Sequence, residues 1–451
     1  MAYAEKRGTG KRPWRARYRK PDGTLASEPG FRTKVDAEDY GEDQEAEIRA
    51  GTWIDPDLMR VHFGLFARKF MAERPKRGRT NGTRWDRLDA YILPKWEYTP
   101  LIGISWFDVD SWQMTLPCED VTKGHVVSLM STILTAAVDA RHLKVNPLYG
   151  RRRTGAVGST PTVGMPRESD EDRAHAPEDV IRVADRLGPA KGLHVLTTGF
   201  TGINWGEGLG LQRANCLLTR RQRWGSTWFE CPVLRVVQEV AEYEERDADG
   251  KKLGTVQKLE PVKTKYRVRD LDLPPFLARL WRYHMEDWPY DWMLATPSGT
   301  WWRRPNWGKQ MRPASDGRRA RERRQGVSER GAWEPIAPGM TMRSLRHTAD
   351  SYQDQIGVRA SLAFEQAGHK RPGIKGVYQH PTPEMRQERL DGLEELFWEA
   401  MRSLGWSTLW GRVDLVKHPK DQTALPNSSQ LILLEGGNGN RRGYRNRSEA
   451  V

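Results

Sequence analysis

The chain has 451 residues, a formal net charge of +14 and a hydrophobic fraction of 37%. Its length predicts two to four domains at roughly 100–200 residues per domain, and its 19 Trp and 10 Phe can fill cores, which argues against a largely disordered chain. No run of about 18 apolar residues is present, and the basic N-terminus has no apolar signal region. We therefore expect neither a transmembrane helix nor a secretory signal.

The cysteines and the excess of basic residues narrow the function further. Cys118, Cys216 and Cys231 are odd in number and form no Cys-x-x-Cys pair. This argues against a disulfide framework and a cysteine-bound zinc ion, and it favours a reducing compartment. Most of the 73 basic residues are Arg, whose guanidinium binds phosphate in a bidentate manner. Nucleic acid is therefore the leading partner predicted from composition.

Residues 1–55 are predicted to form a small basic α+β module. Strand-like alternation around Arg15 and Arg17 is followed by a Pro-Asp-Gly turn, and an acidic, Ala-containing stretch over 35–50 predicts a helix. Arg15, Arg17 and Arg19 share one face of the predicted strand. That face either binds DNA phosphates or is simply solvated, and the charge of the whole chain favours DNA.

Residues 60–148 are predicted to form a helical domain, because apolar residues recur there at the three- and four-residue spacing of a helix. Residues 149–176 are rich in Gly, Ser, Thr and Pro, and are predicted to form a linker that buries no core. The linker opens with three arginines that either contact phosphate or only keep the chain soluble: Arg151, Arg152 and Arg153.

Residues 177–405 are predicted to form the largest unit, an α+β domain of helices and short strands. The Asp-Gly pair at 249–250 is a hairpin-turn signal, and short strands are expected on either side of Lys263. The stretch 383–404 predicts an amphipathic helix, which either packs on its own domain or docks on a neighbouring protomer. Residues 406–451 are polar and are predicted to be disordered.

The residues that carry chemistry fall in short motifs between positions 199 and 380. They are Thr-Gly-Ile-Asn-Trp-Gly-Glu at 201–207, Lys-Thr-Lys at 263–265, Arg-Ser-Leu-Arg-His-Thr at 343–348, Gly-His at 368–369 and Val-Tyr-Gln-His at 377–380. In this order and spacing the motifs resemble the catalytic domain of the tyrosine recombinase (phage integrase) family. The rest of the chain is similar to the larger integrase layout, with an arm-binding module at 1–55 and a core-binding domain at 60–148. The resemblance implies a multidomain, mainly α fold with small β elements.

The resemblance also implies that the chain cuts DNA through a covalent link between a tyrosine and a 3′ phosphate. Tyr378 takes the place of the nucleophile, and Arg346 that of a guanidinium that binds the non-bridging phosphate oxygens. Lys263, with Lys265 as the alternative, takes the place of the acid that protonates the leaving 5′ oxygen. His369 takes the place of the residue that hydrogen-bonds the phosphate or assists proton transfer. This chemistry needs no metal and no cofactor, and we expect none.

Two positions depart from the family pattern. Asn204 stands where the family has a second phosphate-binding Arg, and losing one charge-assisted contact would lower the rate by about 10²–10³-fold. Arg343 stands where the family usually has His. It cannot act as a base near neutral pH, but it can donate to phosphate and partly replace the missing charge. Glu207, in the same motif as Asn204, is predicted to be a buried hydrogen-bond partner rather than a catalytic acid.

These patterns predict a site-specific recombinase of a phage or other mobile element that cuts and rejoins double-stranded DNA. The resemblance implies three partners: attachment-site DNA, a homotetramer assembled through the C-terminal helix, and an accessory protein that sets direction. A membrane is not among them. The expected location is the bacterial cytoplasm, on the nucleoid when DNA is bound. Two alternatives stay open, a recombinase-like DNA-binding protein impaired by Asn204 and a nicking-closing enzyme of the topoisomerase IB type.

Overall fold

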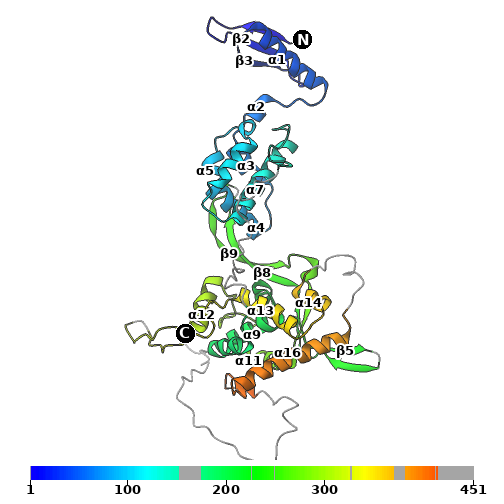
Figure 1. Cartoon of the computed structure of the whole chain (residues 1–451), viewed down its shortest axis with the longest axis vertical. Coiled ribbons are helices and arrows are strands. Elements are labelled where there is room, and N and C mark those ends of the chain that lie inside the picture. The colour runs from blue at the N-terminus through cyan, green and yellow to red at the C-terminus, as the bar shows by residue number, and fades with distance from the viewer. Residues whose placement is uncertain are drawn as a thin grey trace, which may run out of the picture. The chain divides into compact units, whose positions relative to one another are not determined.

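The computed structural model describes residues 2–151, 174–224, 226–247, 249–325, 328–369, 381–411 and 413–414. The chain divides into two compact units. One is Met1–Glu168 together with Gln238–Pro261, and the other is Ser169–Val237 together with Val262–Val451. Helices dominate both units and the sheets are small, which confirms the predicted fold class (Figure 1).

The N-terminal module is a three-stranded antiparallel sheet with one helix; the sequence predicted the strand around Arg15 and the helix, but not the first strand. Strands β1 (Tyr3–Lys6), β2 (Trp14–Arg19) and β3 (Leu25–Phe31) lie in the order β1-β2-β3, and α1 (Lys34–Arg49) follows. The inward residues of β2 are buried, and the ring of Tyr18 packs edge-on against Tyr40 of α1. The period-two alternation in β2 therefore separates a core face from an outer face.

The segment after the module is helical around one hydrophobic core, also as predicted. Its elements are α2 (Pro56–Met59), α3 (Phe63–Glu73), α4 (Gly78–Arg87), a π-helical turn (Leu88–Ile92), α5 (Leu93–Trp96), a 3₁₀ turn (Leu101–Gly103), α6 (Trp106–Met114) and α7 (Asp120–Asp139). The stripes of apolar residues at helical spacing meet in a single cluster that includes Phe63, Trp85 and Met130.

Helix α7 is the central helix of this core. By length and composition alone it is apolar enough to cross a membrane, in contrast to the expectation that the chain has no such helix. Its side chains Val126, Met130, Ile133 and Leu134 are buried in the cluster, as in the core helix of a globular domain. Packing against neighbouring helices therefore accounts for its hydrophobicity.

A long hairpin packs against the helical segment. Strands β8 (Gln238–Arg246) and β9 (Lys252–Pro261) form the hairpin expected from the Asp-Gly signal. Arg246 is buried and binds Asp86 and Asp89 of that segment, and a Cβ atom at Gly250 would lie 2.4 Å from the ring of Trp85. The prediction placed this stretch within the unit 177–405. In the structure the hairpin belongs to the unit that contains the helical segment, because these ion pairs and the contact with Trp85 attach it there.

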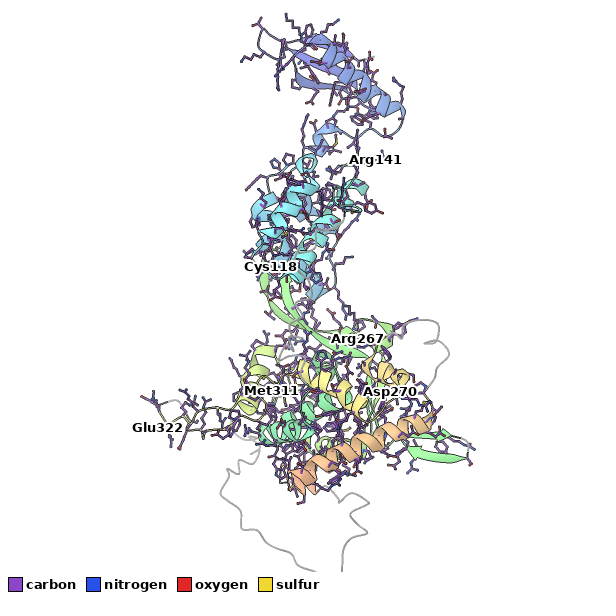
Figure 2. All side chains as sticks on the ribbon, viewed as in Figure 1. Cys118, Arg141, Arg267, Asp270, Met311 and Glu322 are labelled. Atoms are coloured by element: carbon purple, nitrogen blue, oxygen red, sulfur yellow. The ribbon has the colours of Figure 1, made fainter. Side chains whose placement is uncertain are left out.

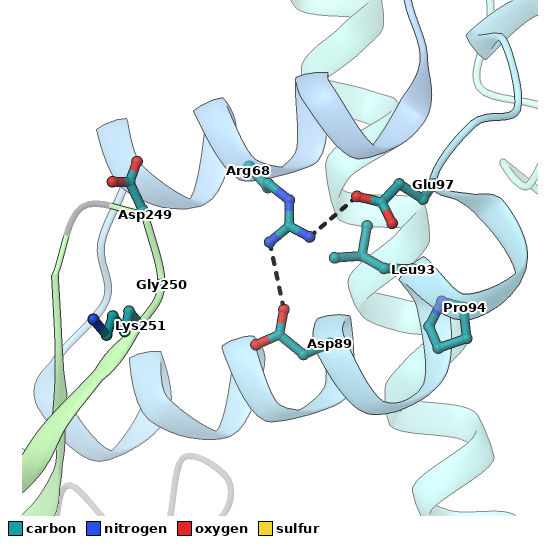
Figure 3. A pocket seen from close by; sticks show the side chains of 8 residues that line it. All are labelled: Arg68, Asp89, Leu93, Pro94, Glu97, Asp249, Gly250 and Lys251. Carbon is teal, nitrogen blue, oxygen red and sulfur yellow. Dashed lines mark hydrogen bonds and ion pairs between the residues drawn. The ribbon is translucent and has the colours of Figure 1, made fainter.

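The hairpin tip also borders a pocket on the helical unit. Arg68 of α3 reaches across it to Glu97 at 3.2 Å and to Asp89 at 3.8 Å (Figure 3). Asp249 and Lys251 of the tip line the same pocket. The turn predicted from sequence is therefore part of a packed surface.

The second unit is built around helices and a short three-stranded sheet. Its first half holds α8 (Pro177–Leu187), α9 (Pro189–Thr201), α10 (Trp205–Leu209), a 3₁₀ turn (Arg213–Asn215), β4 (Cys216–Leu217), β5 (Arg221–Trp224), β6 (Thr227–Glu230) and β7 (Val233–Val236). Its second half holds a 3₁₀ turn (Lys265–Arg267), β10 (Arg269–Asp272), α11 (Pro275–Asp287), α12 (Arg304–Asp316), α13 (Met342–Gln355), α14 (Ala360–Ala367), α16 (Pro383–Ser403), β11 (Thr408–Leu409) and β12 (Val413–Asp414). The sheet order is β10-β7-β4, and all its pairs are antiparallel.

The start of the second unit differs from the predicted linker. His175 is buried, and its Nε2 atom lies 2.8 Å from the hydroxyl of Ser344 on α13. Tyr352 of α13 donates to the backbone carbonyl of His175 at 2.9 Å. The last residues of the stretch 149–176 are therefore anchored in the second unit by hydrogen bonds that the composition did not reveal.

Helix α16 packs on its own unit, which is one of the two interpretations that the sequence left open. Its apolar face is buried, and the ring of Phe397 stacks on Phe276 of α11 with centroids 3.8 Å apart. Arg389, also buried, binds Asp272 of β10. These contacts bury the apolar face of α16 within its own unit.

Replacing Phe397 with Leu should lower the free energy of unfolding of this unit by about 1 kcal/mol, because the ring stacking is lost while most of the buried area is kept. Urea unfolding followed by far-UV circular dichroism measures the change. Phe107→Leu, at an exposed position of α6, is the matched control and should have no effect. Equal stability of the Phe397→Leu variant and that control would contradict the prediction.

Candidate active site

Arg346 is held by the ends of two helices. It lies in α13, where the side chain of Thr341 caps the helix by accepting a hydrogen bond from the backbone of Ser344. Its guanidinium donates to the carbonyl of Gly202 at 2.5 Å and to that of Ala367 at 2.8 Å. Burial lowers the pKa of Arg346 from its ordinary value, but an arginine remains a cation at neutral pH. The structure therefore presents a fixed positive charge.

Two glycines allow these carbonyls to face Arg346. Gly202 ends α9 and Gly368 follows the last turn of α14, and both have a φ of 69°, in the left-handed region. Only glycine adopts this conformation without strain, and it closes each helix so that its last carbonyls are exposed to other donors. A Cβ atom at Gly368 would also lie 3.1 Å from the guanidinium of Arg269.

His369 lies beside Arg346, directly after Gly368. Its Nε2 atom is 3.4 Å from a terminal nitrogen of Arg346, and its backbone N–H donates to Phe364 at 3.0 Å. Burial, together with the charge of Arg346, lowers the pKa of His369 from its ordinary value. His369 is therefore neutral near pH 7 and can accept a proton. The two residues that the sequence motifs place in one site are in contact in the structure.

Glu207 is a buried carboxylate at the centre of a cluster next to this pair. It is fully buried and accepts hydrogen bonds from Arg269 at 2.9 Å and from the backbone and side-chain amides of Asn204 at 3.1 and 2.8 Å. Burial raises the pKa of Glu207, but the charge and hydrogen bonds of Arg269 and the bonds of Asn204 outweigh burial, so the pKa lies below its ordinary value. The prediction that Glu207 is a buried hydrogen-bond partner is confirmed.

Asn204 has a structural partner in this cluster. It precedes α10, and its side-chain amide donates to Oε1 of Glu207. Arg346 contacts Gly202, two residues before Asn204. Asn204 therefore lies two residues after a carbonyl that binds Arg346, and its own side-chain amide is bound to Glu207.

Lys263, Lys265 and Arg343 are exposed. Lys263 follows β9, and Lys265 begins the 3₁₀ turn, with its ammonium group 5.3 Å from the ring of Tyr266. Arg343 is in the first turn of α13, one helical turn before Arg346. Within the described ranges neither lysine bonds to Arg346 or His369. Tyr378 lies outside the described residues.

The predicted DNA-binding arginines of the N-terminal module have protein partners. Arg15 binds Glu5 with two hydrogen bonds, at 2.6 and 3.0 Å, and Arg17 binds the same carboxylate at 2.9 Å. These bonds lower the pKa of Glu5 to about 2. Arg19 is exposed and donates to the carbonyl of Gly23 at 3.1 Å. Glu5 therefore neutralises part of the charge that the alternating sequence pattern assigned to this face.

Of the three arginines predicted to contact DNA at the start of the linker, the structure describes one. Arg151 is exposed, while Arg152 and Arg153 lie outside the described residues. In the part of the chain that the structure describes, no group of three or more His, Cys, Asp or Glu residues is arranged to hold a metal ion.

Two further arginines next to the candidate active site, Arg267 and Arg269, are not part of any motif identified in the sequence. Arg269 is buried, with hydrogen bonds to Glu207, Gln366 and Arg267. Arg267, which is labelled in Figure 2, lies 3.4 Å from the carboxylate of Glu207. The available signal was their position: two arginines separated by one residue, just after the Lys-Thr-Lys motif.

Two solved structures share the fold of this chain. A Tn1549 transposon integrase in complex with transposon right-end DNA is 12% identical, with a TM-score of 0.50 over 73% of this chain and 99% of that chain. The same integrase in complex with a circular intermediate DNA is 11% identical, with a TM-score of 0.51 over the same shares. The chain matches no protein-family model and no curated protein sequence.

The chain therefore shares the fold of this transposon integrase, in agreement with the fold that the motifs predicted. Within that fold, Arg346 and His369 contact one another.

Proposed function

We propose that this protein is a site-specific DNA recombinase that cuts and rejoins double-stranded DNA for the integration or excision of a phage or other mobile element. One observation carries the proposal: Arg346 and His369 lie in contact, held by the ends of α9 and α14, in a chain with the tyrosine-recombinase fold. A fixed guanidinium beside a neutral imidazole suits a phosphodiester, because the main demand is neutralising charge on the non-bridging oxygens.

In the proposed reaction the phenolic oxygen of Tyr378 attacks the phosphorus atom and the bond to the 5′ oxygen breaks. Arg346 binds the non-bridging oxygens in the transition state. His369, neutral near pH 7, accepts the phenolic proton, and Lys263 gives a proton to the leaving 5′ oxygen. Attack of a 5′ hydroxyl on the phosphotyrosine reverses these steps and rejoins DNA. Lys265 is the alternative acid.

The proposal includes the surroundings of the reaction. Four copies would assemble on the DNA as a homotetramer through the C-terminal helix. An accessory protein would set the direction of recombination, and the protein would act in a bacterial cytoplasm. Among the described members of the predicted DNA-contacting set, Arg19 and Arg151 are exposed, while Arg15 and Arg17 bind Glu5.

A covalent protein–DNA adduct is the direct test. The full chain, carrying an affinity tag, is incubated with sheared total DNA of its source organism, denatured in SDS and captured, and the attached DNA is sequenced. We expect enrichment of discrete sites that are lost when Tyr378 is replaced by Phe. A nicked duplex built from the most enriched site then traps the adduct, because the nicked strand diffuses away before rejoining.

A second candidate function is a recombinase-like protein that binds DNA without cutting it. The observation that favours it is Asn204, whose amide is engaged by Glu207 and carries no charge. Retention of the native protein on discrete DNA sites with no adduct after denaturation would support this candidate over the recombinase.

Replacing Arg343 with Ala should abolish covalent attachment to the nicked duplex. Arg343 is exposed one turn before Arg346 on α13, so its guanidinium can donate to the phosphate that Arg346 binds. The measurement is adduct yield on denaturing gels, with Arg359→Ala, at the exposed position before α14, as the matched control. Full attachment by the Arg343→Ala variant would contradict this role.

A further inference from the structure

Arg267 and Asn204 are bound to the same oxygen atom. The guanidinium of Arg267 lies 3.4 Å from Oε1 of Glu207, and the side-chain amide of Asn204 donates to that oxygen at 2.8 Å. The carboxylate thus brings a cation from the 3₁₀ turn after β9 next to the position that begins α10. These two segments are about sixty residues apart in sequence, so no local pattern predicts the contact.

The two arginines that bind Glu207 differ in their exposure to solvent and in the N–H donors that they could offer to a ligand. Arg269 is 3% exposed and its guanidinium is used by Glu207, Gln366 and Arg267. Arg267 is 25% exposed, and its one contact to Glu207 is long. A guanidinium has five N–H donors, so Arg267 retains donors that can turn to a ligand. Arg269 is therefore structural, while Arg267 is a held but accessible cation.

Arg267 also acts electrostatically on the residues of the candidate active site. Its charge lowers the pKa of both Arg346 and His369, after the larger effect of burial. A chain of hydrogen bonds also links the two segments: Arg269 donates to the backbone carbonyls of Arg267 and Gln366, and Arg346 donates to the carbonyl of Ala367, the residue after Gln366. Arg269 therefore ties the segment of Arg267 to the one that holds Arg346.

We propose that Arg267 supplies the second guanidinium that binds the scissile phosphate beside Arg346, in place of the charge that Asn204 lacks. The inference rests on the proposed recombinase function and names a residue of the same site. In the transition state of phosphoryl transfer, negative charge spreads over the non-bridging oxygens. Arg346, which is fixed by two backbone carbonyls, neutralises part of this negative charge, and Arg267 would neutralise more of it.

Arg343 is the other candidate for the second phosphate-binding cation, but it lies on a different element from Arg267. Arg343 lies on α13, the helix of Arg346, whereas Arg267 is tethered to the carboxylate that also holds Asn204. Because Asn204 and Arg267 share this carboxylate, we expect an arginine introduced at position 204 to take over the role of Arg267. This difference allows the two assignments to be separated by experiment.

The first measurement is adduct formation by Arg267→Ala on the nicked duplex that gives the strongest adduct with the unaltered chain. We expect the initial rate to fall about 100-fold, the usual cost of one donor to a transition-state anion. Arg235→Ala is the matched control, because Arg235 is an exposed arginine of β7 whose partner is Asp270, and it should leave the rate unchanged. Thermal unfolding and native-gel DNA binding should be the same for both variants.

Two further measurements distinguish phosphate binding from a structural role. A duplex with a methylphosphonate at the scissile position removes the negative charge, so the ratio of unaltered to Arg267→Ala rates should shrink to about tenfold or less. Adding Asn204→Arg to Arg267→Ala should restore the rate on the ordinary duplex. Adding Asn204→Arg to Arg343→Ala should not. A merely structural arginine would show neither the shrinkage nor the selective rescue.

The outcomes separate this inference from the function on which it rests. If the unaltered chain forms no adduct, the recombinase proposal fails and this inference fails with it. If the unaltered chain forms the adduct and the rate of Arg267→Ala is within about twofold of the unaltered rate, only the inference about Arg267 is overturned. Loss of a phosphate donor would lower the rate far more than that. A large loss that methylphosphonate does not relieve, or rescue of Arg343→Ala instead, also overturns it.

Discussion

The Tyr378→Phe variant should form no covalent adduct with DNA while it binds the same DNA as tightly as the unaltered chain. Phenylalanine keeps the ring and removes only the oxygen that is proposed to attack phosphorus. Without the nucleophile the covalent step is lost, and we expect a fall of at least about 10³-fold. The measurement is adduct yield on denaturing gels, with binding followed on native gels.

A second tyrosine provides the matched control for this experiment. Tyr266 is exposed in the 3₁₀ turn between Lys265 and Arg267, so it is the described tyrosine most easily mistaken for a nucleophile. Tyr266→Phe should form the adduct normally. The reverse pattern, with adduct in Tyr378→Phe and none in Tyr266→Phe, would assign the nucleophile to Tyr266 and remove Tyr378 from the proposal.

The Glu207→Ala variant should lose about 3–5 kcal/mol of unfolding free energy in the second unit, because Arg269 is left as a buried charge without its carboxylate. Urea unfolding followed by tryptophan fluorescence measures the loss. Glu388→Ala, at an exposed position of α16, is the control and should change stability by no more than about 0.5 kcal/mol. A loss below about 1 kcal/mol in Glu207→Ala would mean that the cluster does not hold this unit together.

The same carboxylate predicts a pH dependence with a definite sign. Because the pKa of Glu207 is lowered in the folded chain, its contribution to stability is complete above the ordinary pKa of about 4.5. The contribution is lost as the pH falls through the lower folded value. The difference in stability between the unaltered chain and Glu207→Gln should therefore be constant near neutral pH and shrink in acid. A difference that grows in acid would contradict this sign.

Several parts of the fold followed from local patterns in the sequence. Alternation around Arg15 predicted β2, and the Asp-Gly pair predicted the β8–β9 hairpin. Apolar residues at helical spacing predicted the helical segment and α16. These predictions succeeded because strand pleating, turn geometry and helix periodicity depend on neighbouring residues.

The partners of charged side chains did not follow from such patterns. Glu5 binds Arg15 and Arg17 across two strands, and Arg246 of the hairpin binds Asp86 of a distant helix. The apolar face of α16 fitted packing on its own unit or on a neighbour equally well from sequence. The stacking of Phe397 on Phe276 shows that the apolar face packs on its own unit. The sequence could not show this, because the same amphipathic pattern would suit either surface.

The sequence by itself determined the class of fold and the presence of Arg346 and His369 in one site, because the order and spacing of short motifs identify both. The tertiary structure decided what surrounds them: the carbonyls of Gly202 and Ala367 that hold Arg346, and the carboxylate of Glu207. A missing charge at Asn204 is visible in the sequence. A cation that stands next to it is visible only in the fold, because Arg267 reaches Glu207 from a segment about sixty residues away.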